Sequence, residues 1–379
     1  MSNKIKLELN INKPFSKLSI KFLNDLSLEI RKRFKNKITR EIFYLIFWIS
    51  KKNILKLKEK NFQNNLKNRI GRGKVIHYSA QNISTNFLFS FAFGLLSGNS
   101  NVVFYPEKIK ETKLIIDAIK KVQKNKIFQK IKNSNLFLAN SKRIGYQKIL
   151  KNPNARVMWG GDQKINLIRK DSSVDNRCLD LIFGDRYSIS LIKLKKQSPI
   201  KEIVKNFYYD NFLFNQNACS SSHIIYWYKT DKILIRNFWN ELLIFAKKFE
   251  QIEMDQNLNK LKKINLYFLN NKFKYIKNFG PYFTVLGLSR NYDAENLRGE
   301  NGIFFEKQIK NLDDINKNDI TPKLQTMSIN GVDRTSITKW IEEENITGID
   351  RIVPVGQSLN MDLIWDGHDV IRSLSRVIN

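Results

Sequence analysis

Cysteine and histidine are scarce in this sequence, with two and three residues among 379. The cysteines have no paired spacing, which argues against a disulfide framework, and three histidines form no zinc-binding pattern. We therefore predict no metal site and a reducing, cytoplasmic environment. Long apolar runs are also missing, because the longest, Phe87–Leu96, is interrupted by Ser90 and Gly94. It falls short of the roughly 20 residues that span a bilayer, so we expect no transmembrane segment.

Acidic residues are few relative to basic ones, since 66 Lys+Arg against 35 Asp+Glu give a formal net charge of +31. Such an excess can indicate nucleic acid or an anionic membrane as a partner. Here it consists mainly of lysine scattered among asparagine and isoleucine, without the interleaved aromatics of a recognisable nucleic-acid module. We predict no nucleic-acid partner, but some attraction for anions such as phosphate-bearing cofactors.

The first residues carry charges where a secretory signal needs an apolar core, so no such signal is expected. Residues 1–70 instead have helical periodicity, as in Phe22–Phe34 and Arg40–Lys56. The densely apolar block from Phe43 to Ile49 is followed by lysines. This second helix could pack in a core, or it could lie on an acyl chain or an anionic membrane surface.

At Gly71 the pattern changes to alternating short strands and helices. Lys74–Ser79 predicts a strand, a polar turn containing Asn82 follows, and a helix-like segment then runs to Leu96. Asn101–Tyr105 predicts a second strand. This order indicates a βαβ unit and favours an α/β fold. On its own, Asn82 is typical of an ordinary turn.

A further strand, Ala155–Trp159, ends in Gly160, Gly161 and Asp162. We expect Asp162 to be the N-cap of a helix over Gln163–Arg169. A strand-to-helix turn with glycines can present backbone N–H groups and a helix dipole to phosphate. The turn is not the Gly-x-Gly-x-x-Gly fingerprint, and an ordinary connection is an equal alternative.

Cys219 lies in the small, polar stretch Asn215–His223, which predicts a loop that can hold the thiol at a surface. Cys178 lies beside Leu179 and Leu181 and is expected to be packed. A lone cysteine can be a small buried hydrophobe or a nucleophile. If the protein is an enzyme, we expect the chemistry at Cys219.

From about Gly71 to the C-terminus the chain resembles the bacterial long-chain acyl-CoA reductases. This LuxC-like fatty acid reductase family, known from bioluminescence, belongs to the aldehyde dehydrogenase superfamily. Each matching segment is weak alone, but their order is specific. The segments are Asn82 after a strand, Leu95–Asn99, Trp159–Asp162, Asn217–Ser220, and Arg351–Gly356 followed by Trp365–Gly367.

The resemblance implies an aldehyde-dehydrogenase-like α/β fold. An N-terminal helical segment over residues 1–70 would precede an open-sheet cofactor-binding domain over residues 71–205. An α/β catalytic domain over residues 206–345 would present the cysteine. A return segment over residues 346–379 would make oligomer contacts, so a homo-oligomer is expected. Arg351 and Trp365–Gly367 would hold this return against the catalytic domain. The residues after Gly367 predict a closing helix over Val370–Val377.

The resemblance also implies a reaction. Cys219 would accept an acyl group from a fatty acyl-CoA or an acyl-protein, and NADPH would reduce the S-acyl cysteine to an aldehyde. An acyl-protein synthetase could supply the acyl group. The Asn82 side chain and the backbone N–H of Cys219 would stabilise the oxyanion.

The same resemblance assigns Gly160, Gly161, Asp162 and Tyr105 to cofactor binding. The two glycines would let the cofactor pyrophosphate approach the helix that follows. Asp162 is negatively charged at this point, so the resemblance leaves open which backbone N–H groups would bind the pyrophosphate. Tyr105 stands where the superfamily usually has a lysine that holds the adenosine ribose. The sequence therefore shows no evident lysine or arginine that would bind the 2′-phosphate of NADPH.

Two further residues bear on the chemistry. The superfamily's general-base glutamate is replaced by isoleucine in the best-matching segment, Ile182–Arg186. Without this base water is poorly activated, which favours acyl transfer and reduction over formation of a free acid. His223 follows Cys219 by four residues, but its position in a strand favours a packing or supporting role.

Two alternatives remain at this stage. One is the reverse reaction, the CoA-acylating oxidation of an aldehyde. The other is an acyl-binding or membrane-binding protein that has lost catalysis, which the apolar block Phe43–Ile49 and the altered ribose position would fit.

Overall fold

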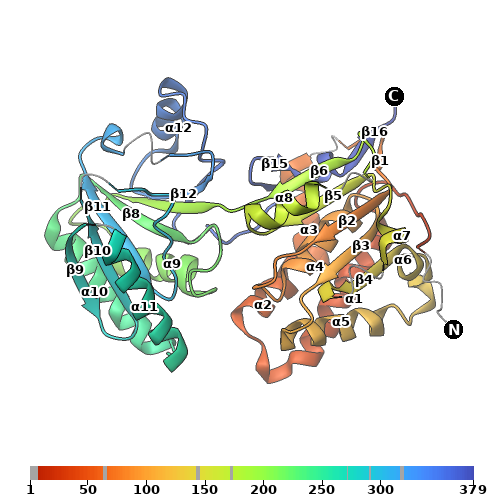
Figure 1. Ribbon diagram of the computed structural model, residues 1–379, viewed down its shortest axis with the longest axis horizontal. Coiled ribbons are helices and arrows are strands. Elements are labelled where there is room, and N and C mark those ends of the chain that lie inside the picture. Colours follow the sequence, from red (N-terminus) through yellow and green to blue (C-terminus); the bar gives the residue numbers. More distant parts are fainter. Residues whose placement is uncertain are drawn as a thin grey trace. The chain divides into compact units, whose positions relative to one another are not determined.

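The computed structural model describes residues 7–62, 66–141, 146–170, 174–270, 272–289, 292–315 and 320–379. The chain forms two compact units. Unit 1 consists of Met1–Gly184 with Asp362–Asn379, and unit 2 consists of Asp185–Met361. Each unit is built around its own β-sheet (Figure 1).

These boundaries differ from the predicted divisions after residues 70, 205 and 345. The N-terminal helices belong to unit 1 and do not form a separate segment. The strand Tyr187–Ile192 pairs within the second sheet, so the division predicted after residue 205 lies after Gly184. The last residues, Asp362–Asn379, return to unit 1.

Unit 1 contains a five-stranded parallel sheet in the order β4-β3-β2-β5-β6, which can be followed by its labels in Figure 1. The chain builds outward from β2 through β3 to β4, then restarts on the other side of β2 with β5. Ligands of open α/β sheets commonly bind at such a switch point, outside the carboxyl ends of the strands. The strands are β2 (Lys74–Tyr78), β3 (Ser100–Tyr105), β4 (Asn135–Ala139), β5 (Ala155–Trp159) and β6 (Leu179–Phe183).

The helices of unit 1 confirm the predicted helix at Phe22–Phe34 but not the single helix at Arg40–Lys56. The chain turns at Ser50, whose hydroxyl and N–H both donate to the carbonyl of Phe47, and two helices result. The helices are α1 (Lys17–Phe34), α2 (Arg40–Trp48), α3 (Lys51–Phe62), α4 (Asn86–Leu96), α5 (Lys110–Val122), α6 (Gln129–Ser134), α7 (Gln147–Leu150) and α8 (Asp162–Arg169).

A buried polar chain joins this sheet to α4. One ring nitrogen of His77 bonds with the Ser90 hydroxyl at 2.8 Å and the other with Asn101 Oδ1 at 2.9 Å. The indole N–H of Trp159 donates to the same hydroxyl at 3.0 Å. Burial lowers the pKa of His77 to about 4, so the ring is neutral at physiological pH. The residue before the Gly-Gly-Asp turn is thereby fixed to the core.

The C-terminal residues add short elements to unit 1. The predicted closing helix over Val370–Val377 is wrong beyond Ser373, because the chain then forms a strand that pairs with β1. Trp365–Gly367, which the resemblance placed against the catalytic domain, belongs to unit 1. The elements are β1 (Arg69–Gly71), β14 (Ile364–Trp365), β15 (His368–Asp369), α13 (Val370–Ser373) and β16 (Ser375–Val377).

Unit 2 contains a seven-stranded sheet in the order β13-β12-β7-β8-β11-β10-β9. All its neighbours are parallel except the edge strand β9, which joins β10 in an antiparallel pair. The strands are β7 (Tyr187–Ile192), β8 (Ser222–Tyr228), β9 (Phe273–Phe279), β10 (Phe283–Leu288), β11 (Ile303–Ile309), β12 (Leu324–Asn330) and β13 (Arg351–Pro354).

Four helices cover the two faces of this sheet. Successive residues of β8 alternate between two cores, as Ile224 does with Ile225. One core includes α9 (Ile200–Phe212) and α10 (Lys232–Phe249). The other includes α11 (Met254–Asn270) and α12 (Arg334–Glu343). No helix within the described ranges is long and apolar enough to cross a membrane.

Candidate active site

Cys219 lies in the loop between α9 and β8, and its side chain is exposed, as the sequence predicted. The loop has a defined path. Asn215 and Gln216 adopt positive φ angles of 50° and 63°. The buried side chain of Gln216 donates to the carbonyls of Ser222 and Ile303, both at 3.0 Å. The loop is therefore tied to the start of both β8 and β11.

The carbonyl of Cys219 accepts a hydrogen bond of 2.7 Å from the hydroxyl of Ser188 in β7. Ser188 is fully buried. The register of β7 with β8 shifts by one residue between Ser188 and Ile189, leaving His223 as the extra residue of β8. Such bulges re-aim side chains near functional sites. Ser188 therefore fixes the peptide that carries Cys219.

Asp210 ties the end of α9 to a second loop. Its buried carboxylate accepts from the N–H of Gly356 at 2.6 Å and from the N–H and hydroxyl of Ser358 at 3.0 and 2.9 Å. Its own carbonyl accepts from the Ser221 hydroxyl at 2.7 Å. Burial raises the pKa of Asp210 to about 6, although these donors favour the carboxylate. Arg351 reaches the same loop, donating to the carbonyl of Ser358 at 3.1 Å.

His223 is buried at the start of β8, which agrees with a supporting role. Burial, reinforced by the positive charges of Arg298 and Lys263, lowers the pKa of His223 to about 3. The ring is therefore neutral at physiological pH and cannot serve as an imidazolium partner for the Cys219 thiolate. Its Nδ1 has no hydrogen-bond partner within the described ranges.

Cys178 is half-buried just before β6. Burial raises the pKa of its thiol to about 11, an effect that Arg156 partly offsets. At neutral pH few Cys178 thiols are therefore ionised. Cys178 should react slowly, because thiol reactivity follows the thiolate fraction. Cys219 is thus exposed, whereas Cys178 is half-buried and mostly protonated at neutral pH.

Asn82 is exposed in unit 1, in the loop between β2 and α4. The loop is held near both ends. The N–H of Ala80 donates to Asn86 Oδ1 at 2.9 Å, and the hydroxyl of Thr112 donates to the carbonyl of Ser84 at 3.2 Å. Asn82 therefore lies near the tip of a loop that is fixed near both ends, at the carboxyl end of β2.

The Gly-Gly-Asp turn lies at the carboxyl end of β5. Gly161, rather than Asp162, is the N-cap of α8, and Asp162 is the first helical residue, which corrects the predicted start. Gly160 has a φ of 140°, a value that L-residues rarely adopt. A Cβ added at Gly161 would meet no atom within 4 Å, so the space beside it is open.

Lys164 extends from the first turn of α8 back across the switch point. Its ammonium donates to the carbonyl of Ser79, after β2, at 2.6 Å and to that of Trp159, in β5, at 3.3 Å. The side chain passes Gly160, where an added Cβ would lie 3.3 Å from Lys164 Cδ. The hydroxyl of Ser79 is buried and has no partner within the described ranges. A cation and an unpaired hydroxyl therefore occur between β2 and β5.

Tyr105 ends β3 and is partly buried against Phe87, with ring centroids 6.0 Å apart. Burial and the nearby Glu107 raise the pKa of Tyr105, so its hydroxyl stays neutral at physiological pH. Ile182 lies within β6 and packs against an apolar cluster. It offers no group that could act as a base.

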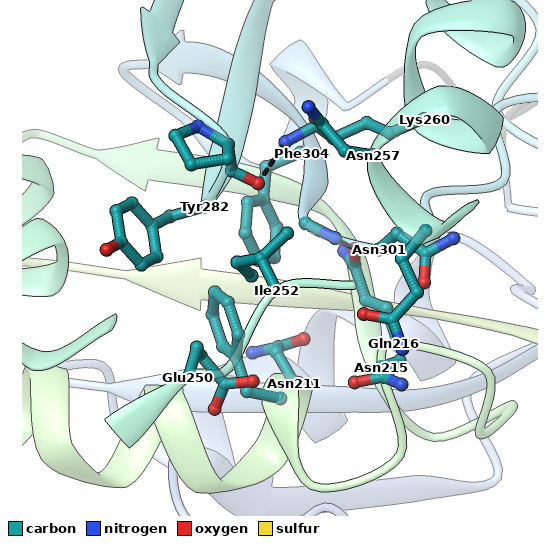
Figure 2. Close-up of a pocket in the computed structure, with 14 residues that line it drawn as sticks. Asn211, Asn215, Gln216, Glu250, Ile252, Asn257, Lys260, Tyr282, Asn301 and Phe304 are labelled. Carbon is teal, nitrogen blue, oxygen red and sulfur yellow. Dashed lines mark hydrogen bonds between the residues drawn. The ribbon is translucent and has the colours of Figure 1, made fainter. Parts of the chain in front are cut away.

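Figure 2 shows a pocket beside the segment Asn215–Gln216 of the cysteine loop. Lys260 lies at its wall and donates to the carbonyl of Pro281 at 2.5 Å, and burial lowers the pKa of Lys260 to about 8. The lining combines polar side chains with the apolar side chains of Phe212, Ile252 and Phe304. The pocket is lined by Asn211, Phe212, Asn215, Gln216, Glu250, Ile252, Gln256, Asn257, Lys260, Pro281, Tyr282, Asn301, Gly302 and Phe304.

The predicted site residues fall into two groups. Unit 1 contains Asn82, Tyr105 and the Gly-Gly-Asp turn at the carboxyl ends of three strands of one parallel sheet, and unit 2 contains Cys219. Sequence reasoning missed Ser188 and Lys164. The spacing from Gly160 to Lys164, one helical turn into α8, was the only available signal for the lysine. In the part of the chain that the structure describes, no cluster of three or more His, Cys, Asp or Glu could hold a metal ion.

Comparison with protein families gives one match across almost the whole chain. The family model described as acyl-CoA reductase (LuxC) matches residues 4–378. No curated protein matches the sequence. The family that the residues resembled is therefore confirmed.

Solved structures give the fold. A glyceraldehyde-3-phosphate dehydrogenase, GapN, from Methanocaldococcus jannaschii, complexed with NADP, has a TM-score of 0.66 at 13% identity, covering 97% of this chain and 89% of that one. Aldehyde dehydrogenase 21 from Physcomitrella patens has a TM-score of 0.64 at 10% identity, covering 95% and 85%. A 1-pyrroline-5-carboxylate dehydrogenase from Thermus thermophilus has 0.65 at 10% identity, covering 96% and 80%. The predicted aldehyde-dehydrogenase-like fold is confirmed.

The contrast between the cysteines predicts selective alkylation. With limiting iodoacetamide at pH 8, we expect Cys219 to be modified first, because about one in 1,000 Cys178 thiols is ionised at that pH. Peptide mass spectrometry over time measures both rates, and Cys219→Ser isolates the slower one. Labelling of Cys178 should accelerate as the pH rises toward 11. Equal rates at pH 8 would contradict this assignment.

Proposed function

The chain belongs to the acyl-CoA reductase (LuxC) family, and on this premise we propose that it reduces a long-chain fatty acyl thioester to an aldehyde with NADPH, through an acyl group carried on Cys219. The observation that supports this most is the exposed thiol of Cys219 on a loop whose flanking residues are fixed by buried hydrogen bonds. A positioned, accessible thiol suits covalent acyl transfer.

In the first step the Cys219 thiolate attacks the carbonyl carbon of the acyl thioester. A new carbon–sulfur bond forms, the carbonyl oxygen gains negative charge, and the intermediate collapses as the CoA thiolate leaves. A thiolate suits both directions of this exchange, because it is a strong nucleophile and a good leaving group. The acyl group then remains on Cys219 as a thioester.

The developing oxyanion needs donors that are already in place. We assign this role to the Asn82 carboxamide and the backbone N–H of Cys219. The bond from Ser188 to the Cys219 carbonyl supports the assignment, because it fixes the orientation of the residue. Losing one such donor typically slows the reaction about 100- to 1,000-fold.

The acyl-enzyme must survive until it is reduced. Ile182 replaces the usual glutamate base, and His223 is buried with an unusually low pKa, so neither residue suits activation of water near the thioester. A slow hydrolysis preserves the S-acyl group for hydride transfer. Collapse of the reduced intermediate returns the Cys219 thiolate and releases the aldehyde.

The residues of unit 1 fit a dinucleotide. When bound, NADPH supplies the hydride. Gly161 opens to free space at the start of α8, and the Lys164 ammonium lies across the adjacent switch point. An ammonium and helix N–H groups suit a pyrophosphate. The Asp162 carboxylate would repel a phosphate at this turn. We therefore assign Asp162 to stabilising the N-terminus of α8.

The remaining assignments belong to the same proposal. Tyr105 would contact the adenosine ribose through its neutral hydroxyl. The acyl donor would be a fatty acyl-CoA or an acyl-protein delivered by a synthetase, and the protein would act as a cytoplasmic homo-oligomer. The pocket beside Asn215 is not assigned to any substrate.

The proposed reaction is tested by incubating the protein with tetradecanoyl-CoA and NADPH. We expect tetradecanal and free CoA to form as NADPH is consumed. Cys219→Ser should abolish all three changes, since an alkoxide is a far poorer leaving group than a thiolate, whereas Cys178→Ser should retain them. Consumption of NADPH that persists in Cys219→Ser would contradict the assigned nucleophile. Repeating the assay with NADH and with shorter acyl groups tests the cofactor and chain length.

Lys164 provides a separate test of the cofactor site. Lys164→Met should raise the Kd for NADPH about 10- to 100-fold, the loss expected for one charged hydrogen bond. Titration of NADPH fluorescence without acyl substrate measures this directly. Lys170→Met, at the other end of the same helix, is the matched control. An equal loss for NADH identifies a pyrophosphate contact, a loss for NADPH alone identifies the 2′-phosphate, and no loss for either removes Lys164 from the site.

A further inference from the structure

A glutamate in the N-terminal helices holds the loop that carries Asn82. One carboxylate oxygen of Glu41, in α2, accepts three hydrogen bonds: from the Ser84 hydroxyl at 2.7 Å, the Thr85 N–H at 3.0 Å and the Thr85 hydroxyl at 2.7 Å. Thr85 is the N-cap of α4 and makes no side-chain cap bond of its own. Glu41 thus supplies a cap from a distant part of the sequence.

The packing of α2 on α4 sets the position of this carboxylate. Tyr44 contacts Phe89 with ring centroids 6.0 Å apart, and Trp48 contacts Phe89 and Phe93 at 5.3 and 5.4 Å. Residues 41, 44 and 48 lie on one face of a helix, because they are three and four residues apart. The aromatic contacts therefore direct Glu41 to the N-terminus of α4.

The other contacts of the loop leave a short segment at its tip. Ser84 is held on its hydroxyl by Glu41 and on its carbonyl by Thr112. On the opposite side, the carbonyl of Ser79 accepts from Lys164, and the N–H of Ala80 bonds to Asn86. Gln81, Asn82 and Ile83 span the interval between these anchors. Releasing the Glu41 anchor would give Asn82 more freedom without removing a group from the apolar core.

We propose that Glu41 is a positioning residue for the Asn82 carboxamide, and that the N-terminal helices thereby contribute to the rate of acyl transfer. This inference rests on the oxyanion role proposed for Asn82. Displacement of a donor by about 1 Å can cost on the order of 100-fold in rate, so a remote anchor can matter for chemistry. Binding of the acyl thioester itself needs no contribution from Glu41.

The test is a double-mutant cycle on S-acylation of Cys219, measured in a single turnover with tetradecanoyl-CoA and no cofactor. We expect Glu41→Ala to slow the maximal rate about 10- to 100-fold with little change in half-saturation. Asn82→Ala should slow it more. In the Asn82→Ala background, Glu41→Ala should add less than about threefold, because its effect acts through the missing side chain. Glu59→Ala, an exposed glutamate in α3, is the matched control.

A second readout does not depend on activity. Hydrogen exchange of the amides in residues 80–85 should accelerate in Glu41→Ala and stay unchanged in Glu59→Ala, while the thermal midpoint shifts little in both. Rate losses that multiply in the double variant would overturn the positioning role, as would an unchanged exchange rate.

The possible failures are distinguishable. A wild-type protein that never acylates Cys219 contradicts the proposed function, and the exchange measurement alone then decides whether Glu41 orders the loop. If the wild type acylates Cys219 but Asn82→Ala does so equally fast, the reaction stands, whereas the oxyanion role of Asn82 and the inference about Glu41 both fail.

Discussion

Loops that cross the ends of a buried parallel sheet must find partners for their backbone polar groups away from water, and this requirement organises both units of the protein. In unit 2, Ser188 donates to the carbonyl of Cys219, and Gln216 donates to the carbonyls of Ser222 and Ile303. In unit 1, Lys164 donates to the carbonyl of Ser79 and Glu41 accepts from the N–H of Thr85, at the two ends of the loop that contains Asn82. The partners come from distant elements, so these loops have fixed paths without regular secondary structure. A site that stabilises a transient charge requires groups that are already held in place.

The chemistry that this order permits depends as much on the residues that are missing as on those present. Cys219 is accessible, whereas His223 is kept neutral mainly by its burial, which the positive charges of Arg298 and Lys263 reinforce. By the resemblance, Ile182 stands where the superfamily has its general-base glutamate. A thiol with no evident base to deliver water suits acyl exchange and reduction better than hydrolysis. The cation of the proposed cofactor site comes from α8, since Lys164 folds back over Gly160 to the carboxyl end of β2.

Local patterns predicted the parallel strands and the exposed cysteine, because strand periodicity and small polar loops are properties of short segments. Patterns of that length could not predict the break between α2 and α3, which depends on how Ser50 turns the chain. They also placed Val370–Val377 in one helix, although pairing with β1, about 300 residues earlier, converts its end to a strand. The supporting roles of Ser188, Lys164 and Glu41 were not visible for the same reason. Each depends on a hydrogen bond between elements that are distant in sequence or on a side chain that turns back across the sheet.

We propose that Cys219 carries the acyl group between two half-reactions. The most direct measurement is peptide mass spectrometry of the wild-type protein after incubation with tetradecanoyl-CoA in the absence of any nicotinamide cofactor. We expect a hydroxylamine-sensitive tetradecanoyl group on the peptide that contains Cys219, and its loss as tetradecanal when NADPH is then added. An acyl group found only on Cys178, or on no cysteine with any acyl length, would contradict this role of Cys219.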